Sequence, residues 1–251
     1  MKILAIGNSF SQDATRYLYS IARAGGVSLK VVNLYIGGCS LYRHYRNMLS
    51  GEDAYSYEIN GMTSGLYVSL KKVLLSDEWD VVTLQQRSAD SWKAESYEPY
   101  LSRLAAFVRE HAPAAKLYIH RTWAYENGAK RLELIGAESA EQMLADLTRC
   151  YNWAAEQVSA DGIIPSGDAM YRLHSELVKT ERSAFRDGFH ASLGLGRYLL
   201  GLVWYGTLCG GDILSNTFAD LDKQSPPELL ALAREIAHET VMEHLSREAF
   251  K

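Results

Sequence analysis

Residues 2–11 have the sequence KILAIGNSFS, and this stretch decides the fold. Residues 2–6 form a short, mostly apolar run, which is typical of a parallel strand buried on both faces. Gly7 permits a sharp turn that a residue with a Cβ would resist, and residues 13–25 have the apolar spacing of a helix. We therefore expect Ser9 at the carboxyl edge of a sheet, where open α/β folds bind their ligands.

The polar pair Asn8-Ser9 has three interpretations. One of the two side chains can cap the following helix by accepting a hydrogen bond from a free amide. Ser9 can instead be a nucleophile, provided that a base reaches its hydroxyl. A phosphate-binding loop is the weakest of the three, because the turn holds one glycine and matches neither G-x-G-x-x-G nor the Walker pattern. The turn taken alone favours the cap.

Composition and charge exclude several classes of protein. Hydrophobic residues make up 47% of the chain and charged residues 22%, as in ordinary globular proteins. A net charge of −4 gives no electrostatic case for nucleic acid or an anionic membrane as partner. The three cysteines, Cys39, Cys150 and Cys209, form neither a metal pattern nor a disulfide framework. No signal-peptide pattern precedes the first strand, so we expect a cytoplasmic protein.

The rest of the chain alternates strands with helices. Further strands are expected at residues 28–35, 80–85, 116–122 and 162–165, and helices at residues 41–49, 97–111, 137–159, from 166, 192–208 and 225–245. This alternation, without a linker or an internal repeat, predicts one parallel sheet with helices on both faces in a single domain, residues 1–251. Residues 123–136 are expected to be a loop that overhangs the sheet edge.

Residues 51–75 depart from this alternation. Tyr55, Tyr57 and Ile59 alternate with polar residues ahead of Asn60-Gly61, a turn pair typical of a β-hairpin. We expect this hairpin to be an excursion from the main sheet. A helix over residues 66–75 should follow it, since Leu66, Leu70, Val73 and Leu74 fall on one helical stripe.

Four blocks stand in order over nearly the whole chain. They are Ile6-Gly7-Asn8-Ser9-Phe10-Ser11, Val31-Val32-Asn33 with Gly38 following, Asp80 to Asp90, and Asp187-Gly188-Phe189-His190. Together they resemble the SGNH (GDSL-type) esterases and lipases, in a divergent bacterial branch similar to the DUF4886 proteins. The resemblance implies a three-layer α/β/α sandwich with a flavodoxin-like sheet of five parallel strands in the order 2-1-3-4-5. It also implies that Ser9 is the nucleophile and His190 the general base, with Asp187 orienting the imidazole.

The resemblance implies an oxyanion hole as well, in which one expected donor is missing. The family uses the backbone amides of the nucleophile and of the second-block glycine, which are Ser9 and Gly38 here. It also uses an asparagine side chain, but Ala89 stands at that position and cannot donate from its side chain. Gln86 or Gln85 can replace it, since each carries an amide NH₂. We favour Gln86, which is the first residue past the expected strand.

The resemblance thus implies a serine esterase that removes a small acyl group, such as acetyl, from a carbohydrate or a similar alcohol. No cofactor is needed, and no histidine and carboxylate group has zinc spacing. His120 is expected to be a hydrogen-bonded core residue. Trp123, Tyr125, Tyr42 and Tyr45 can form an aromatic wall for the substrate or simply pack in the core. Two alternatives stay open: acyl transfer to an acceptor other than water, and a non-catalytic or vestigial carbohydrate-binding protein that keeps the pocket.

Overall fold

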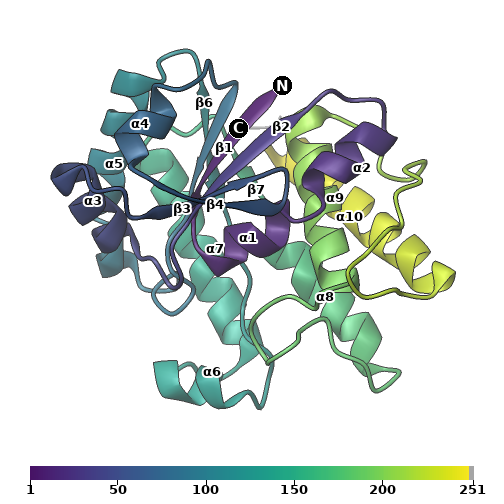
Figure 1. The fold of residues 1–251 in the computed structure, drawn as a ribbon. Coiled ribbons are helices and arrows are strands. Elements are labelled where there is room, and N and C mark those ends of the chain that lie inside the picture. Colours follow the sequence, from purple (N-terminus) through teal and green to yellow (C-terminus); the bar gives the residue numbers. More distant parts are fainter. Residues whose placement is uncertain (249–251) are drawn as a thin grey trace.

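A computed structural model describes residues 1–248 and contains one mixed sheet of seven strands with helices on both faces (Figure 1). The strand order is β4-β3-β2-β1-β5-β6-β7. Five strands are mutually parallel: β2 (Lys30–Tyr35), β1 (Lys2–Gly7), β5 (Val81–Leu84), β6 (Lys116–His120) and β7 (Gly162–Ile164). The expectation of a three-layer α/β/α arrangement is therefore confirmed, with β1 at the centre of the sheet.

The expectation of a sheet with five strands in all is wrong, because the hairpin of β3 (Tyr55–Ile59) and β4 (Met62–Val68) extends it. β3 pairs antiparallel with β2, so the hairpin is part of the sheet and not an excursion from it. Asn60 and Gly61 have φ of 51° and 80°, as a tight hairpin turn requires. The helix expected from residue 66 begins at Leu70 instead, because residues 67 and 68 pair with β3 and Ser69 caps the helix.

The helices follow the expected order with shifted ends, except that two helices, α1 (Ser9–Thr15) and α2 (Leu18–Ala24), replace the one expected over residues 13–25. On one side of the sheet in Figure 1 lie α3 (Leu41–Ser50), α4 (Leu70–Leu74) and α5 (Tyr100–His111), and on the other side α1, α2, α9 (Leu195–Cys209) and α10 (Pro227–Glu248). α7 (Ala140–Gln157) packs against β6 and β7, whereas α8 (Ser166–Val178) packs against α9 and α10. The expected loop at 123–136 contains a short helix, α6 (Lys130–Ile135), and a 3₁₀ turn spans Ala94–Ser96.

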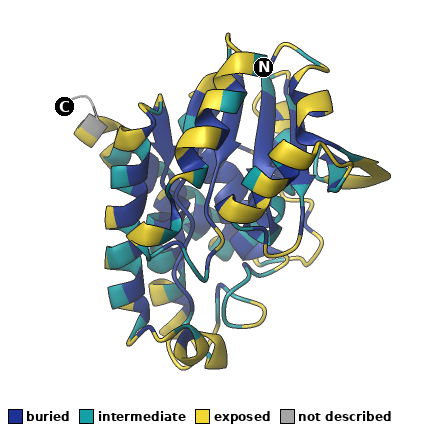
Figure 2. Ribbon diagram, turned by 90° about the vertical axis from the view of Figure 1, so that its left-hand side faces the viewer, coloured by how far each residue is buried: buried dark blue, intermediate teal, exposed yellow. Residues whose placement is uncertain are grey.

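The core is centred on β1 and α9. Residues 3–6 of β1 are at most 1% exposed, and Figure 2 shows the strands as the buried interior with exposed residues on the outer helices. α9 packs against α1, α2, α8 and α10, and most of its side chains are buried. None of the described helices is long and apolar enough to cross a membrane.

The parallel strands place their carboxyl ends at one edge of the sheet. Gly7 and Tyr35 share a register position there, as do Ile6 and Leu84 in the next strand pair. The turns that follow β1, β2 and β5 therefore begin side by side. These turns carry Ser9, Gly38 and the Gln85-Gln86 pair, which are 29 or more residues apart in the sequence.

Candidate active site

Three of the predicted side chains form a hydrogen-bonded series at this edge. The Ser9 hydroxyl lies 2.9 Å from Nε2 of His190, although the two residues are 181 positions apart. On the other side of the ring, Nδ1 of His190 lies 2.7 Å from an Asp187 carboxylate oxygen. With the carboxylate at Nδ1, that nitrogen carries the proton, and Nε2 is left to accept from Ser9. The structure thus brings Ser9, His190 and Asp187 into the geometry of a nucleophile, base and orienting carboxylate.

Asn8, and not Ser9, caps α1. The Asn8 backbone is extended, and its Oδ1 accepts a hydrogen bond from the Phe10 amide at 3.0 Å. This satisfies one of the free amides at the helix start. The Ser9 side chain is consequently not needed for capping and is directed to His190. The cap favoured by the isolated turn sequence therefore exists, but it leaves Ser9 available for chemistry.

One turn supplies both Asp187 and His190. An Asp187 oxygen accepts hydrogen bonds from the backbone amides of His190 at 2.8 Å and Phe189 at 3.3 Å. Gly188 between them has φ of 81°, a conformation that favours glycine. Partial burial raises the pKa of Asp187, but the hydrogen bonds from His190 and these amides outweigh it and hold the pKa below its usual value. Asp187 is therefore a carboxylate at neutral pH.

A chain of buried hydrogen bonds holds the turn that carries Asn8 and Ser9. Ser166 Oγ is 3.0 Å from Nε2 of His120, and Nδ1 of His120 is 2.6 Å from Oε1 of Gln85. Gln85 donates from its amide to Asn8 Oδ1 at 2.9 Å, and Asn8 donates in turn to the Cys39 carbonyl at 3.0 Å. Burial lowers the pKa of His120 to about 3, so its ring is neutral, with one donor and one acceptor. The expectation that His120 is a hydrogen-bonded core residue is confirmed.

The structure does not bring Gln86 to the site. The Gln86 amide NH₂ donates to the Ser96 carbonyl at 2.8 Å, and its Oε1 accepts from the Leu41 amide at 2.9 Å. Gln85, the second candidate for the missing oxyanion donor, donates to Asn8 and is 2% exposed. Both glutamines are thus occupied inside the protein, and the preference for Gln86 is corrected. Ala89 does line the cleft, beside Ser9 and Gly38.

A cleft of about 410 Å³ opens above Ser9 and His190. Of the four aromatic residues considered for a substrate wall, only Tyr125 lines it. Trp123 is fully buried and stacks on Phe10 with ring centroids 4.1 Å apart, whereas Tyr42 packs against Tyr100. The sequence reasoning missed the other lining side chains that can contact a substrate: Gln12, Tyr35, Arg87, Ser88, Arg131, Arg186 and Phe189. The sequence could have indicated that Phe189 lines the cleft, since Phe189 lies between Asp187 and His190 in the Asp-x-x-His segment.

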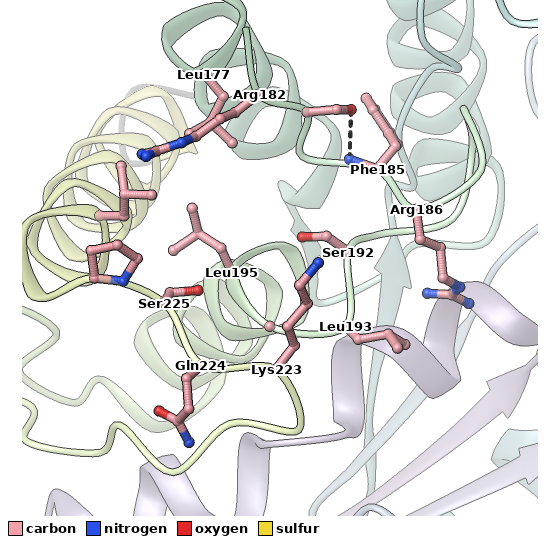
Figure 3. A pocket seen from close by; sticks show the side chains of 14 residues that line it. Leu177, Arg182, Phe185, Arg186, Ser192, Leu193, Leu195, Lys223, Gln224 and Ser225 are labelled. Atoms are coloured by element: carbon pink, nitrogen blue, oxygen red, sulfur yellow. Dashed lines mark hydrogen bonds between the residues drawn. The ribbon is translucent and has the colours of Figure 1, made fainter. Parts of the chain in front are cut away.

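A second cavity, of about 560 Å³, lies between α8, α9 and the start of α10 (Figure 3). Its lining includes Leu177, Arg182, Phe185 and Ser225, but none of Ser9, His190 or Asp187. Arg186 lies at its edge and extends toward α1, where it pairs with Asp13. Ser9 and His190 line the smaller cleft instead. Within residues 1–248, no cluster of histidine, cysteine and carboxylate groups is arranged to hold a metal ion.

The fold is shared with solved structures. A DUF4886 family protein from Bacteroides uniformis superposes with a TM-score of 0.88 at 30% identity, over 96% of this chain and 95% of that one. A candidate SGNH hydrolase from Slackia heliotrinireducens gives a TM-score of 0.59 at 22% identity, over 83% and 98%. An acetyl xylan esterase gives 0.56 at 14% identity, over 83% and 100%. No curated protein matches the chain.

The family model described as "Domain of unknown function (DUF4886)" matches residues 2–240, which is nearly the whole chain. This span includes the Ser9 turn, the Gly38 loop and the Asp187–His190 turn. The two more distant structures share the arrangement of sheet and helices and so support the expected SGNH-type fold. The chain therefore belongs to the DUF4886 family, a divergent branch with the fold of the SGNH-type hydrolases.

Proposed function

We propose that the protein is a serine esterase that hydrolyses a small acyl ester of a carbohydrate or similar alcohol. The observation that carries the proposal is the continuous series from Ser9 Oγ to His190 Nε2 at 2.9 Å and from His190 Nδ1 to Asp187 at 2.7 Å. A serine hydroxyl is a weak nucleophile until a base accepts its proton. Here the base is positioned by a carboxylate and faces an open cleft.

The proposed reaction proceeds in two halves. Ser9 Oγ attacks the ester carbonyl while His190 Nε2 takes the hydroxyl proton, and Asp187 stabilises the resulting imidazolium. The tetrahedral intermediate collapses, the C–O bond to the alcohol breaks, and His190 gives its proton to the departing oxygen. Water then attacks the acyl-serine with His190 again as base, which releases the carboxylic acid and restores Ser9.

The charge that develops on the carbonyl oxygen needs hydrogen-bond donors aimed at it. The proposed donors are the backbone amides of Ser9 and Gly38, whose residues both line the cleft. The buried chain through Asn8 joins the two turns, because Asn8 caps the helix after Ser9 and also bonds to the Cys39 carbonyl. Residue 89 adds no side-chain donor to this set, since Ala89 lies where the resemblance places an asparagine.

The substrate is the least constrained part of the proposal. The cleft of about 410 Å³ has room for a small acyl group and part of an alcohol. Of the structures that share the fold, one is an acetyl xylan esterase, which makes acetylated carbohydrate a reasonable first substrate to test. The alternative of a binding protein without turnover draws support from the missing donor at Ala89.

Initial rates of 4-nitrophenyl acetate hydrolysis test the proposal. Ser9→Ala and His190→Ala should each lower kcat by about 10³-fold or more, because members of such a unit act together. Ser102→Ala, which removes an exposed serine hydroxyl on α5, is the matched control and should retain the full rate. Full activity of Ser9→Ala would assign the hydrolysis to another site. Absence of turnover in the folded parent protein would favour the binding protein.

A further inference from the structure

The cleft above Ser9 has a one-sided charge. Three arginines line it, Arg87, Arg131 and Arg186, and no aspartate or glutamate is among its described lining residues. The chain as a whole has the opposite sign, with a net charge of −4. A concentration of one charge in a cleft focuses the local potential and attracts ligands of the other sign.

The three guanidinium groups are not equally available. Arg186 donates to both carboxylate oxygens of Asp13, at 3.0 and 2.9 Å, and the Asp13 side chain is fully buried. Arg186 is therefore held by Asp13, although its own side chain is 26% exposed. Arg87 pairs with Asp90 at 2.6 Å, but the Arg87 side chain is 44% exposed. Such surface pairs are weak, so Arg87 can turn to a ligand at little cost.

Arg131 is joined to His190 through a stack of side chains. Its guanidinium lies over the Phe189 ring, 4.2 Å from the ring centroid, and the Phe189 and His190 rings are 3.8 Å apart. This stacking holds the flat face of the guanidinium and leaves its N–H edge for polar groups, of which the Tyr125 hydroxyl is one. Within residues 1–248, no ion pair joins Arg131 to a carboxylate.

Two carboxylates border the adjoining hollow that Arg131 also lines, but both have other partners. Glu126 accepts from the Ser183 hydroxyl at 2.7 Å, and Asp187 holds His190. Arg131 thus resembles a guanidinium kept ready for an anion that the protein itself does not supply. Arginine is suited to that role because its fork matches the two oxygens of a carboxylate.

We propose that the esterase takes an acidic substrate: an acyl ester whose alcohol part also bears a carboxylate, which Arg131 binds with help from Arg87. The inference rests on the proposed function and narrows its substrate class to esters of acidic sugars or similar hydroxy acids. The carboxylate lies against Arg131 while the acyl carbonyl lies at Ser9. Arg131 then selects the substrate and takes no part in proton transfer.

A matched pair of probes tests this: 4-acetoxybenzoate and its methyl ester, which differ in the free carboxylate. The wild-type protein should hydrolyse the acid with a kcat/KM at least about tenfold higher, in line with a charged hydrogen bond. Arg131→Met should lower kcat/KM for the acid at least about fivefold more than for the methyl ester. Sodium chloride at high concentration should lower the ratio of kcat/KM for the acid to kcat/KM for the methyl ester, because salt screens exposed charges.

Arg103→Met is the control, since it removes one exposed arginine of α5 outside the cleft, and it should keep the wild-type ratio. Equal kcat/KM values for the two probes, or a ratio of these values unchanged by Arg131→Met, would overturn the inference. If the acetyl group of the methyl ester were still hydrolysed, the proposed esterase function would nevertheless be supported. If the wild-type protein hydrolyses neither these probes nor 4-nitrophenyl acetate, the proposed function itself fails and the acidic substrate fails with it.

Discussion

The side-chain amide of Gln85 donates to Asn8 Oδ1 at 2.9 Å, and so ties the end of β5 to the turn that carries Ser9. Behind Gln85 stand His120 and Ser166, and every hydrogen bond in this buried chain can run in one direction. Bonds aligned in this way strengthen one another in a low-dielectric interior. The chain ends at the Cys39 carbonyl, next to Gly38, and therefore spans the two turns whose amides we propose as oxyanion donors.

We expect Gln85 to act as a positioning residue for these turns. Gln85→Glu keeps the acceptor for His120 but, as a carboxylate, loses the donor to Asn8, so kcat should fall about tenfold, which is about 1.4 kcal/mol of barrier. KM should stay nearly constant, since the donors act mainly in the transition state. Gln85→Met, which removes both bonds, should show at least the same loss. Steady-state kinetics together with thermal unfolding would contradict this role if Tm fell while kcat did not change.

Ala89→Asn should raise the rate of the proposed ester hydrolysis. Ala89 lines the cleft beside Ser9 and Gly38, and an asparagine there can add the side-chain donor that the superfamily uses. One such donor typically raises kcat by a factor on the order of 10²–10³. Even a partly aligned amide should therefore raise kcat about tenfold. The gain should appear in kcat with 4-nitrophenyl acetate. An unchanged kcat would mean that another group already serves the oxyanion.

Gln86→Ala provides the contrast to Ala89→Asn. Its side chain bonds to Leu41 and Ser96 inside the protein, so the substitution leaves buried groups without partners. We expect the free energy of unfolding to fall by about 1–3 kcal/mol. A urea titration measures this loss. A fall in kcat of about 10²-fold at unchanged stability would instead restore Gln86 as an oxyanion donor.

Stability should fall as the solution is acidified below pH 6.5, in part because of two buried histidines. Burial lowers the pKa of both His44 and His120 from 6.5 to about 3. Between these values the unfolded chain binds protons that the folded chain does not, so stability is present above pH 6.5 and is lost progressively toward pH 3. At 1.36 kcal/mol per pH unit, each histidine costs about 2 kcal/mol at pH 5.

Urea unfolding at pH 7, 6 and 5 measures this loss. His44→Gln and His120→Gln should each remove about one proton's contribution from the slope of unfolding free energy against pH, and the double variant about two. Wild-type and variant slopes that coincide would show that these rings take up protons in the folded state.

The sequence predicts the parts of the site that local pattern encodes. An aspartate and a histidine three apart can share one turn, so Asp187 and His190 are expected together, and the strand-turn-helix pattern places Ser9 at the sheet edge. The structure adds what the turn sequence left open: Asn8 takes the cap and frees Ser9.

Other features depend on which way a side chain faces. Gln85 and Gln86 directly follow β5, outside the regular alternation of the strand, so the sequence does not reveal which of the two faces Asn8. Gln85 faces Asn8, whereas Gln86 faces Ser96. The arginines of the cleft come from three separate segments, and only tertiary structure collects them. The edge strand β4 is largely exposed, so its residues lack the burial pattern that distinguishes a strand from a helix.

The central claim is that Ser9 is a nucleophile activated by His190. Incubation with a fluorophosphonate, followed by intact mass and peptide mapping, tests it most directly, because an activated serine displaces the fluoride and becomes phosphonylated. We predict one adduct per chain, on Ser9, none on Ser9→Ala, and labelling at least about 10²-fold slower in His190→Ala. A folded wild-type protein that takes up no adduct, or a Ser9→Ala variant that is labelled at the wild-type rate, would contradict the claim.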